Sequence, residues 1–184
     1  MFESSRRRIL SILDDALTLT QIDVEGEKFS AAPVSLSRVL TRAMERAAEP
    51  ARLRDVKLEC LPAGKIDVVG EEELLITALH ALAETGVKFA SPGETVRIQY
   101  EAAVDSTPII IDSSGTTIPA SMVQNFFSPL SISEASVGGV DLGLRPTVAH
   151  QILSLFGGTA FIANRDSLAI RLTALLKNPY FNPN

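Results

Sequence analysis

The chain has 184 residues, 46% of them hydrophobic, which is enough for a single domain with a sizeable core and excludes a disordered chain. Its formal net charge of -5 argues against nucleic acid as the main partner, because phosphate backbones are bound by clustered positive charge. A single cysteine, Cys60, excludes an internal disulfide and a cysteine-based zinc cluster, and its strand-like surroundings predict a buried thiol.

The sequence carries no sign of a membrane segment. No apolar run reaches the roughly 18 residues typical of a membrane span, and no secretory leader is visible. We therefore expect a cytoplasmic location with no direct membrane contact in this segment. If the chain is the cytoplasmic part of a membrane-associated receptor, we expect the span in another part of that receptor.

The first predicted element is an amphipathic helix over residues 4–20. Its apolar side chains recur at helical spacing and form one broad face, and Ser4 or Ser5 can cap its start. An isolated helix of this length is marginal in water, so the apolar face needs a partner that buries it. Docking on the chain's own domain and a helix–helix interface between subunits both meet this need, and the pattern does not choose between them.

Helices and strands alternate along the rest of the chain. A connector with an extended piece spans residues 21–35, Pro119 opens a short helix, and a helix at 142–156 tolerates Pro146 only in its first turn. The other helices are predicted at 36–52 and 71–89, and the strands at 56–61, 65–69, 95–104, 108–111, 159–163 and 167–175. Helices gathered on one face of a mostly antiparallel sheet make an α+β fold, a two-layer sandwich with an N-terminal amphipathic helix.

Several short segments carry motifs in a fixed order. The motif segments are LSILDDALTLTQIDVEGEKF at 10–29, EEELLITALHALAETGVKFASPG at 71–93, IIIDSSGTTIP at 109–119, FFSPL at 126–130 and GGVDLGLRPTVAHQILSLFGG at 138–158. In this order they resemble the catalytic ATP-binding domain of two-component sensor histidine kinases, a GHKL ATPase domain of the Bergerat fold. The resemblance covers nearly the whole chain, and we expect that fold.

The resemblance implies a domain organisation and a set of partners. The segments that it implies are the second helix of a dimerisation and phosphotransfer hairpin at 1–22, a linker at 23–35, a histidine-kinase-like ATPase domain at 36–177 and a frayed tail at 178–184. It also implies self-association through the N-terminal helix, at Leu10, Leu13 and Leu17. A response regulator or a phosphotransfer helix is the other partner that it implies.

No catalytic residue is assigned by the resemblance. The family's phosphoacceptor histidine lies on the first dimerisation helix, whereas this sequence matches the family from the second helix onward. His80 and His150 fall inside predicted helices, where we interpret both as partly exposed structural residues. The sequence therefore leaves open whether the chain is an enzyme.

The long helix at 71–89 carries the family's metal-binding position. In the family ATP binds with Mg²⁺, and an asparagine on this helix ligates the ion. Thr85 stands at that position, where its shorter hydroxyl either ligates the ion or fills the vacated space. Glu84 is one residue away, a rotation of about 100° around the helix, which directs it away from the site. Lys88 is retained and either meets a phosphate or is a solvated surface residue.

The first glycine box follows the strand predicted at 108–111. Counted back from Ile118, the family's adenine-binding aspartate falls on Ser113. A one-residue loop insertion would instead bring Asp112 to the adenine, and without it Asp112 points to the opposite side of the strand. Both alternatives remain open. Of the later glycine positions in this box, Gly115 is retained and Thr117 replaces the other.

The second glycine box retains Gly139 and Gly143, but Asp141 replaces its middle glycine. Glycine lets the backbone approach the triphosphate, whereas a carboxylate repels it by about 1 kcal/mol when well solvated and by several when not. The lid, at 128–137, is short. Together with Thr85, these departures predict a histidine-kinase-like domain with weak or absent binding of ATP and Mg²⁺. The alternative is a non-catalytic pseudokinase or phosphotransfer-type scaffold that binds a signalling partner.

Overall fold

A computed structural model describes residues 2–61, 64–101, 103–128 and 140–179 of the chain. Its main element is a five-stranded sheet in the order β2-β4-β5-β7-β6, in which β2 and β4 are parallel and the other neighbours are antiparallel. The strands are β2 (Lys57–Cys60), β4 (Thr95–Tyr100), β5 (Ser106–Ser114), β6 (Thr159–Asp166) and β7 (Ala169–Lys177). The expected α+β arrangement with a mostly antiparallel sheet is confirmed.

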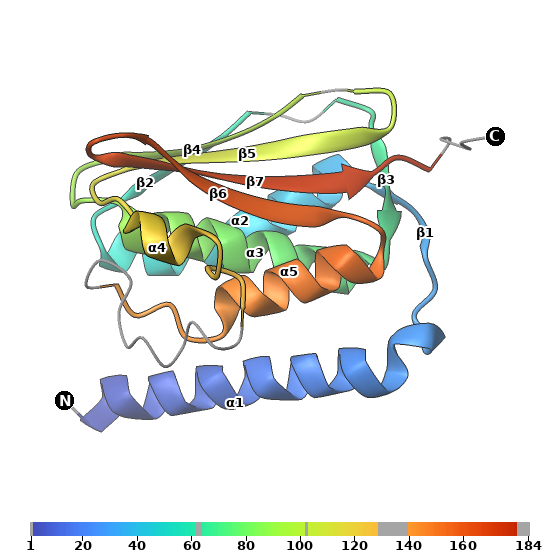
Figure 1. Cartoon of the computed structure of the whole chain (residues 1–184), viewed down its shortest axis with the longest axis horizontal. Coiled ribbons are helices and arrows are strands. Elements are labelled where there is room, and N and C mark those ends of the chain that lie inside the picture. Colours follow the sequence, from blue (N-terminus) through green and yellow to red (C-terminus); the bar gives the residue numbers. More distant parts are fainter. Residues whose placement is uncertain (1, 62–63, 102, 129–139, 180–184) are drawn as a thin grey trace.

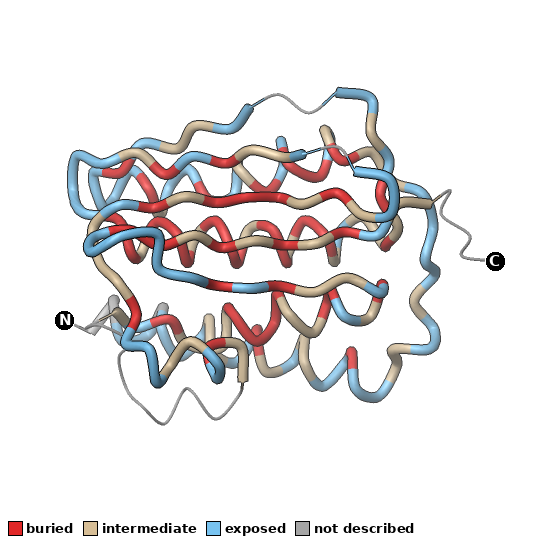
Figure 2. Tube along the Cα trace, turned by 45° about the horizontal axis from the view of Figure 1, so that its top comes forward, coloured by how far each residue is buried: buried red, intermediate tan, exposed pale blue. Residues whose placement is uncertain are grey.

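Helices cover one face of this sheet and form a second layer (Figure 1). They are α2 (Leu36–Leu53), α3 (Glu72–Phe89), α5 (Arg145–Leu155) and a short helix, α4 (Ala120–Val123). The core lies between the two layers, where Ile109 and Ile111 of β5 are 0% and 1% exposed. Figure 2 shows the buried residues gathered in the central strands and along the helices that face them.

Helix α3 packs between α2 and α5 and has buried residues on most sides. The carboxylate of Glu71 caps its N-terminus by accepting hydrogen bonds from N–H groups of the first turn. At the other end Arg54 donates to the carbonyl oxygens of Val87 and Lys88. The contacts of Arg54, which follows α2, and the packing between α2 and α5 fix the set of side chains of α3 that faces each neighbour.

The predicted helix boundaries are correct to within a few residues. Pro146 lies in the first turn of α5, as the prediction required, and Gly157 follows the helix with a φ of 76°. Strand pairing with β7 extends β5 to Ser114 and β6 to Asp166, so both following turns begin later than predicted. Cys60, predicted to be buried, is exposed because it ends the edge strand β2.

The N-terminal helix, α1 (Phe2–Glu25), is longer than predicted and lies outside α5, away from the sheet (Figure 1). A 3-10 turn, η1 (Gly26–Lys28), leads to β1 (Ala32–Ser35), which pairs antiparallel with β3 (Asp67–Gly70) in a separate two-stranded sheet. The predicted linker is therefore partly helix and partly strand, because its start continues α1 and its end pairs with β3. In the described ranges, α1 and the other helices all lack the combined length and apolar composition needed for a membrane crossing.

Helix α1 has two apolar faces. One packs against α5, where Ile22 is 7% exposed and Leu19 is partly buried. The other carries Leu10, Leu13 and Leu17, which are 48%, 54% and 68% exposed and which we call the outer stripe. Helix α1 therefore docks on the chain's own domain with one face and leaves its other apolar face open to a second helix.

Candidate functional site

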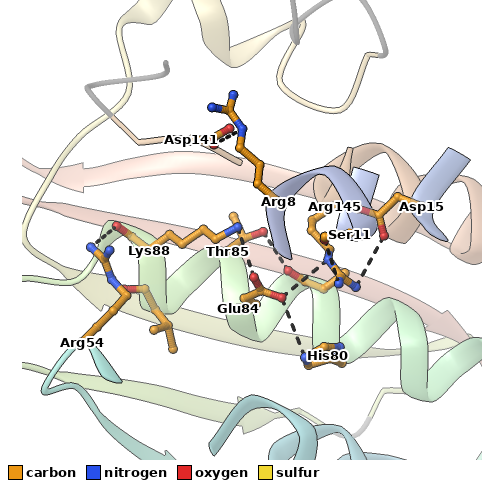
Figure 3. A network of polar contacts seen from close by, with 12 residues as sticks. Arg8, Ser11, Asp15, Arg54, His80, Glu84, Thr85, Lys88, Asp141 and Arg145 are labelled. Atoms are coloured by element: carbon orange, nitrogen blue, oxygen red, sulfur yellow. Dashed lines mark hydrogen bonds and ion pairs between the residues drawn. The ribbon is translucent and has the colours of Figure 1, made fainter. Parts of the chain in front are cut away.

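A polar pocket of about 690 Å³ opens between α1, α2, α3 and the segment that precedes α5. Its wall includes Leu142 and Gly143 from the second glycine box. The charged and titratable side chains that line it are Arg8, Arg46, His80, Glu84, Lys88, Asp141 and Arg145. Cations and carboxylates therefore face one another across this pocket, and all but Arg46 are labelled in Figure 3.

Glu84 is the centre of the polar contacts on α3 (Figure 3). His80 and Lys88 lie one helical turn before and after it, so the three side chains share one face. Lys88 Nζ is 3.1 Å from Glu84 Oε1, and His80 Nε2 is 3.8 Å from Glu84 Oε2. Burial by itself raises the pKa of Glu84, but the charges of Lys88 and Arg145 hold that pKa below its ordinary value. Glu84 is therefore a carboxylate held among cations.

Arg145, the first residue of α5, connects α3 to α1. Its guanidinium lies 3.5 Å from Asp15 Oδ1 and 3.5 Å from Glu84 Oε2. It also donates a hydrogen bond of 3.2 Å to Ser11 Oγ. A positive charge at a helix N-terminus is opposed by the helix dipole, so these carboxylates offset an otherwise unfavourable position.

Asp15 is buried, with 4% of the residue exposed, although it lies on the outermost helix. Burial raises the pKa of Asp15 to about 6 from 3.8 and outweighs the opposing charge of Arg145. The negative charge of Glu84 raises the pKa further. The contact between α1 and the body of the domain therefore contains a carboxyl whose pKa is raised to about 6.

His80 is partly exposed, as predicted, with 14% of its side chain accessible. Burial lowers its pKa to about 4, and the charge of Arg145 adds to this effect. The imidazole is therefore neutral at pH 7, and its Nε2 has no hydrogen-bond partner within the described residues. His150 lies elsewhere, stacked on Phe127 with ring centroids 5.6 Å apart.

Asp141, which replaces the middle glycine of the second box, pairs with α1. Arg8 Nε lies 2.8 Å from its carboxylate, so the negative charge is offset by the N-terminal helix. Gly143 lines the pocket with a φ of 57°, a conformation that favours glycine. Gly139 and positions 129–137 of the predicted lid lie outside the described residues.

Thr85 and Ser113 lie in the interior and are absent from the lining of the polar pocket. They are 1% and 2% exposed, and their hydroxyls donate hydrogen bonds of 2.7 Å to the carbonyls of Ala81 and Gly86, respectively. The described ranges contain no group of three or more His, Cys, Asp or Glu side chains that could hold a metal ion. Buried and hydrogen-bonded within α3, the Thr85 hydroxyl is not presented to a magnesium ion in the polar pocket.

The face of α3 that borders the pocket differs from the expected one. We expected Glu84 to be directed away from the nucleotide site, whereas Glu84 and Lys88 line the polar pocket and Thr85 fills interior space, one of its two alternatives. The reason is the position of α1, whose Arg8 and Ser11 form the opposite wall. Thr85 faces the interior of the domain and packs there.

Asp112 lies on the face of the sheet opposite to the helices. Its carboxylate accepts hydrogen bonds of 2.8 and 2.9 Å from Arg171 and lies 3.3 Å from Arg165. The next residue, Ser113, points to α3. Of the two alternatives for this box, the structure has the one in which Asp112 points away, because β5 continues to Ser114 without an inserted residue.

Gly115 and Thr117 belong to the segment after β5 and are not among the pocket residues. Gly115 forms an isolated bridge with Ala90, at the end of α3, and a Cβ added there would collide with backbone atoms. Asn164 fixes the same segment, because its side chain accepts from the N–H of Ile118 and donates to the carbonyl of that residue. Thr117, beside it, is half-buried.

No family model matches the sequence. The chain is 29% identical over 161 residues to the circadian input-output histidine kinase CikA of Synechococcus elongatus, covering 84% of this chain and 21% of that protein. The histidine kinase AdeS of Acinetobacter baumannii aligns with a TM-score of 0.73 at 16% identity, covering 97% of this chain and 84% of that one. The ATP binding domain of PrrB from Mycobacterium tuberculosis aligns at 0.62 and 25% identity, covering 81% and 98%.

This is the fold of a histidine-kinase ATP-binding domain. The sequence and structural relatives are histidine kinases, represented mainly by their catalytic domains, which confirms the resemblance found in the motifs. The chain spans about a fifth of the length of the cyanobacterial relative, 21%. In this histidine-kinase-type domain the polar pocket lies where α1 meets the second glycine box.

The pocket of this histidine-kinase-type domain contains residues that the sequence interpretation does not assign. His80, Glu84 and Lys88 are spaced by four residues, and this spacing is the signal by which they are predictable as one face of α3. Asp15 and Arg145 give no such signal. Their contact depends on how α1 packs against α5, which is a tertiary property.

Proposed function

We propose that the chain is the histidine-kinase-like ATP-binding domain of a two-component signalling protein and that its nucleotide site is degenerate. The fold and the relatives support the first part of this proposal. The observation that carries the second part is the burial of Thr85 and Ser113, at the expected metal and adenine positions. Each hydroxyl is buried against a carbonyl of α3 and absent from the polar pocket, so neither is presented to ligate a metal ion or to accept from the adenine amino group.

The phosphate end of the site is better preserved, but two of its cations, Arg8 and Lys88, are paired with carboxylates. Lys88 and Gly143 line the polar pocket, yet Lys88 is paired with Glu84 at 3.1 Å. A phosphate has to compete with that carboxylate for the ammonium group, and Asp141 adds a second negative charge nearby. Since an ATP triphosphate is itself strongly anionic, these carboxylates oppose its binding.

We expect ATP to bind with a dissociation constant above about 1 mM, which corresponds to only about 4 kcal/mol of binding free energy. Adding Mg²⁺ should change this affinity little, because Thr85 replaces the ligating amide. Isothermal titration calorimetry with and without Mg²⁺ measures both quantities, with Mg²⁺ alone as the control titration. Micromolar, magnesium-dependent binding would overturn the degenerate site.

The second candidate function is a non-catalytic scaffold that binds a signalling partner. The outer stripe favours it, because three exposed leucines at helical spacing suit a second helix. In this proposal the N-terminal helix mediates self-association, and a response regulator or phosphotransfer helix is the other partner. A cytoplasmic location belongs to both candidate functions.

We expect Leu13→Asp to lower the apparent mass of the protein, because the substitution puts a charge in the middle of the outer stripe. Light scattering of the parent and the variant measures this directly. Val104→Asp is the matched control, since Val104 is 83% exposed and lies outside α1. A monomeric mass for the parent protein would contradict self-association through this stripe.

A further inference from the structure

Helix α1 borders the polar pocket but is attached to the domain by a narrow contact. Ser5, Arg8, Ser11 and Ile12 of this helix form one wall of the pocket. Among the α1 side chains that the structure describes, only Asp15 and Ile22 are buried. Figure 2 shows most of the helix as exposed or partly exposed. A small contact of this kind is easily shifted by the free energy of one or two interactions.

Polar groups make up much of that contact. Asp15 lies 3.5 Å from the guanidinium of Arg145, which also donates to Ser11. Nearer the N-terminus, Arg8 lies 2.8 Å from Asp141. These contacts link α1 to Asp141, inside the second glycine box, and to Arg145, two residues after it, so the position of α1 and the shape of the pocket are coupled.

We propose that α1 is a reversible latch across the polar pocket. It docks where Asp15 meets Arg145, and a lower pH favours the docked position over the released one. The buried carboxyl is the reason, because burial without sufficient compensation favours its neutral form. The position of α1 does not depend on nucleotide binding. Only the consequence for access of a nucleotide to the pocket rests on the proposed function.

The direction of the pH effect follows from proton binding. The docked helix holds Asp15 with a pKa of about 6, whereas a released helix returns the carboxyl to water and to an ordinary value near 4. The docked state therefore binds the proton more tightly. Docking is favoured as the pH falls through about 6, and this advantage is lost as the pH rises above it. The titration of Asp15 by itself raises the ratio of docked to released helix about tenfold from pH 7.5 to 5.

Other charged groups face Asp15 from each element packed around it. They are Asp14 on α1, Glu84 and Lys88 on α3, and Arg145 on α5. His80 lies beyond Glu84, and its pKa of about 4 in the docked state leaves it neutral between pH 5 and 7.5. The lowered pKa of Glu84 leaves that residue charged over the same range. Asp15 is thus the group in this set that binds its proton more tightly in the docked state, whereas protonation of His80, whose ordinary pKa is 6.5, opposes docking to the extent that release exposes its side chain.

The test measures the position of α1 by double electron–electron resonance, without nucleotide. Spin labels are placed at Ile9→Cys on α1 and Glu45→Cys on α2, both exposed, in a Cys60→Ser background. Dilution with unlabelled chain removes distances between copies. We expect the docked-to-released ratio to rise about tenfold between pH 7.5 and 5. The same distance distribution at both pH values would overturn the proposal.

Two variants separate Asp15 from other titrating groups. The side chain in Asp15→Asn is neutral at every pH and nearly the same size. The tenfold change in the docked-to-released ratio should therefore disappear, and any pH dependence that remains reports other groups such as His80. Asp14→Asn removes the exposed neighbouring carboxylate and should keep the response. An unchanged response in Asp15→Asn would assign the effect elsewhere and overturn the latch. Because the readout is a distance, failure of ATP binding does not affect the result.

Discussion

Replacing Thr85 by Asn together with Asp141 by Gly is expected to lower the dissociation constant for Mg-ATP by roughly one and a half to three decades. The first change supplies an amide oxygen, which is longer than the Thr85 hydroxyl but has to turn out of that buried position to reach the metal, and the second removes a carboxylate that lines the polar pocket. Together they contribute about 2–4 kcal/mol, counting a hydrogen bond to a charged group and the relieved repulsion. Calorimetry of the double variant against the parent measures the gain.

The ion pair between Arg8 and Asp141 provides an internal control for this experiment. In the parent, Arg8 is occupied by that carboxylate, and Asp141→Gly frees it to face a phosphate. Adding Arg8→Gln to the double variant should therefore remove part of the gain. If the double variant folds, as judged by circular dichroism, but shows no thermal shift with Mg-ATP, the cavity has closed. The partner-binding scaffold would then be the function to keep.

Gly115→Ala is expected to destabilise the domain by about 2–6 kcal/mol, the largest effect on stability that we predict. A φ of 153° strains any residue with a side chain, at a cost of about 1–3 kcal/mol. A Cβ there would also lie 2.4 Å from the backbone nitrogen of Ser91 and 2.6 Å from the carbonyl oxygen of Phe89. Relieving such a clash costs about 1–3 kcal/mol more. Urea unfolding measures the total.

Gly93→Ala is the matched control for that prediction. Gly93 also has a positive φ, 84°, but no atom lies within 4 Å of an added Cβ. This variant should therefore lose only the conformational part, about 1–3 kcal/mol. The difference between the two variants isolates the steric contact between the segment after β5 and the end of α3. Equal losses would show that this contact yields at little cost.

The fold was largely predictable because its helices have clear local signals. Helix α2 places Leu36, Val39, Leu40 and Ala43 at helical spacing, and all four are buried as expected. Strand ends were less predictable, because Ser114 and Asp166 are held in β5 and β6 by pairing with β7 and not by their own preferences. The extension of α1 to Glu25 likewise depends on packing against the body of the domain.

The candidate site was only partly predictable. Helix α3 is apolar or buried on most sides, so its sequence does not reveal which face borders a pocket, and the place of Glu84 in the pocket lining was not predicted. The direction of Asp112 depends on a single residue of register in β5, which motif counting leaves open. The burial of Asp15 depends on tertiary contacts alone, and no periodicity in α1 marks it.

The two faces of α1 have a consequence for signalling. A partner that binds the outer stripe contacts no residue on the inner face, so it changes the position of the helix only through a preference for one position. A partner that binds both positions of the helix equally tightly would leave their populations unchanged. Moving the population from 99:1 to 1:99 requires a preference of about ten-thousandfold, far above the tenfold effect expected from protonation of Asp15. Protonation of Asp15 would therefore change the partner concentration at which the helix moves, while binding of the partner itself would move it.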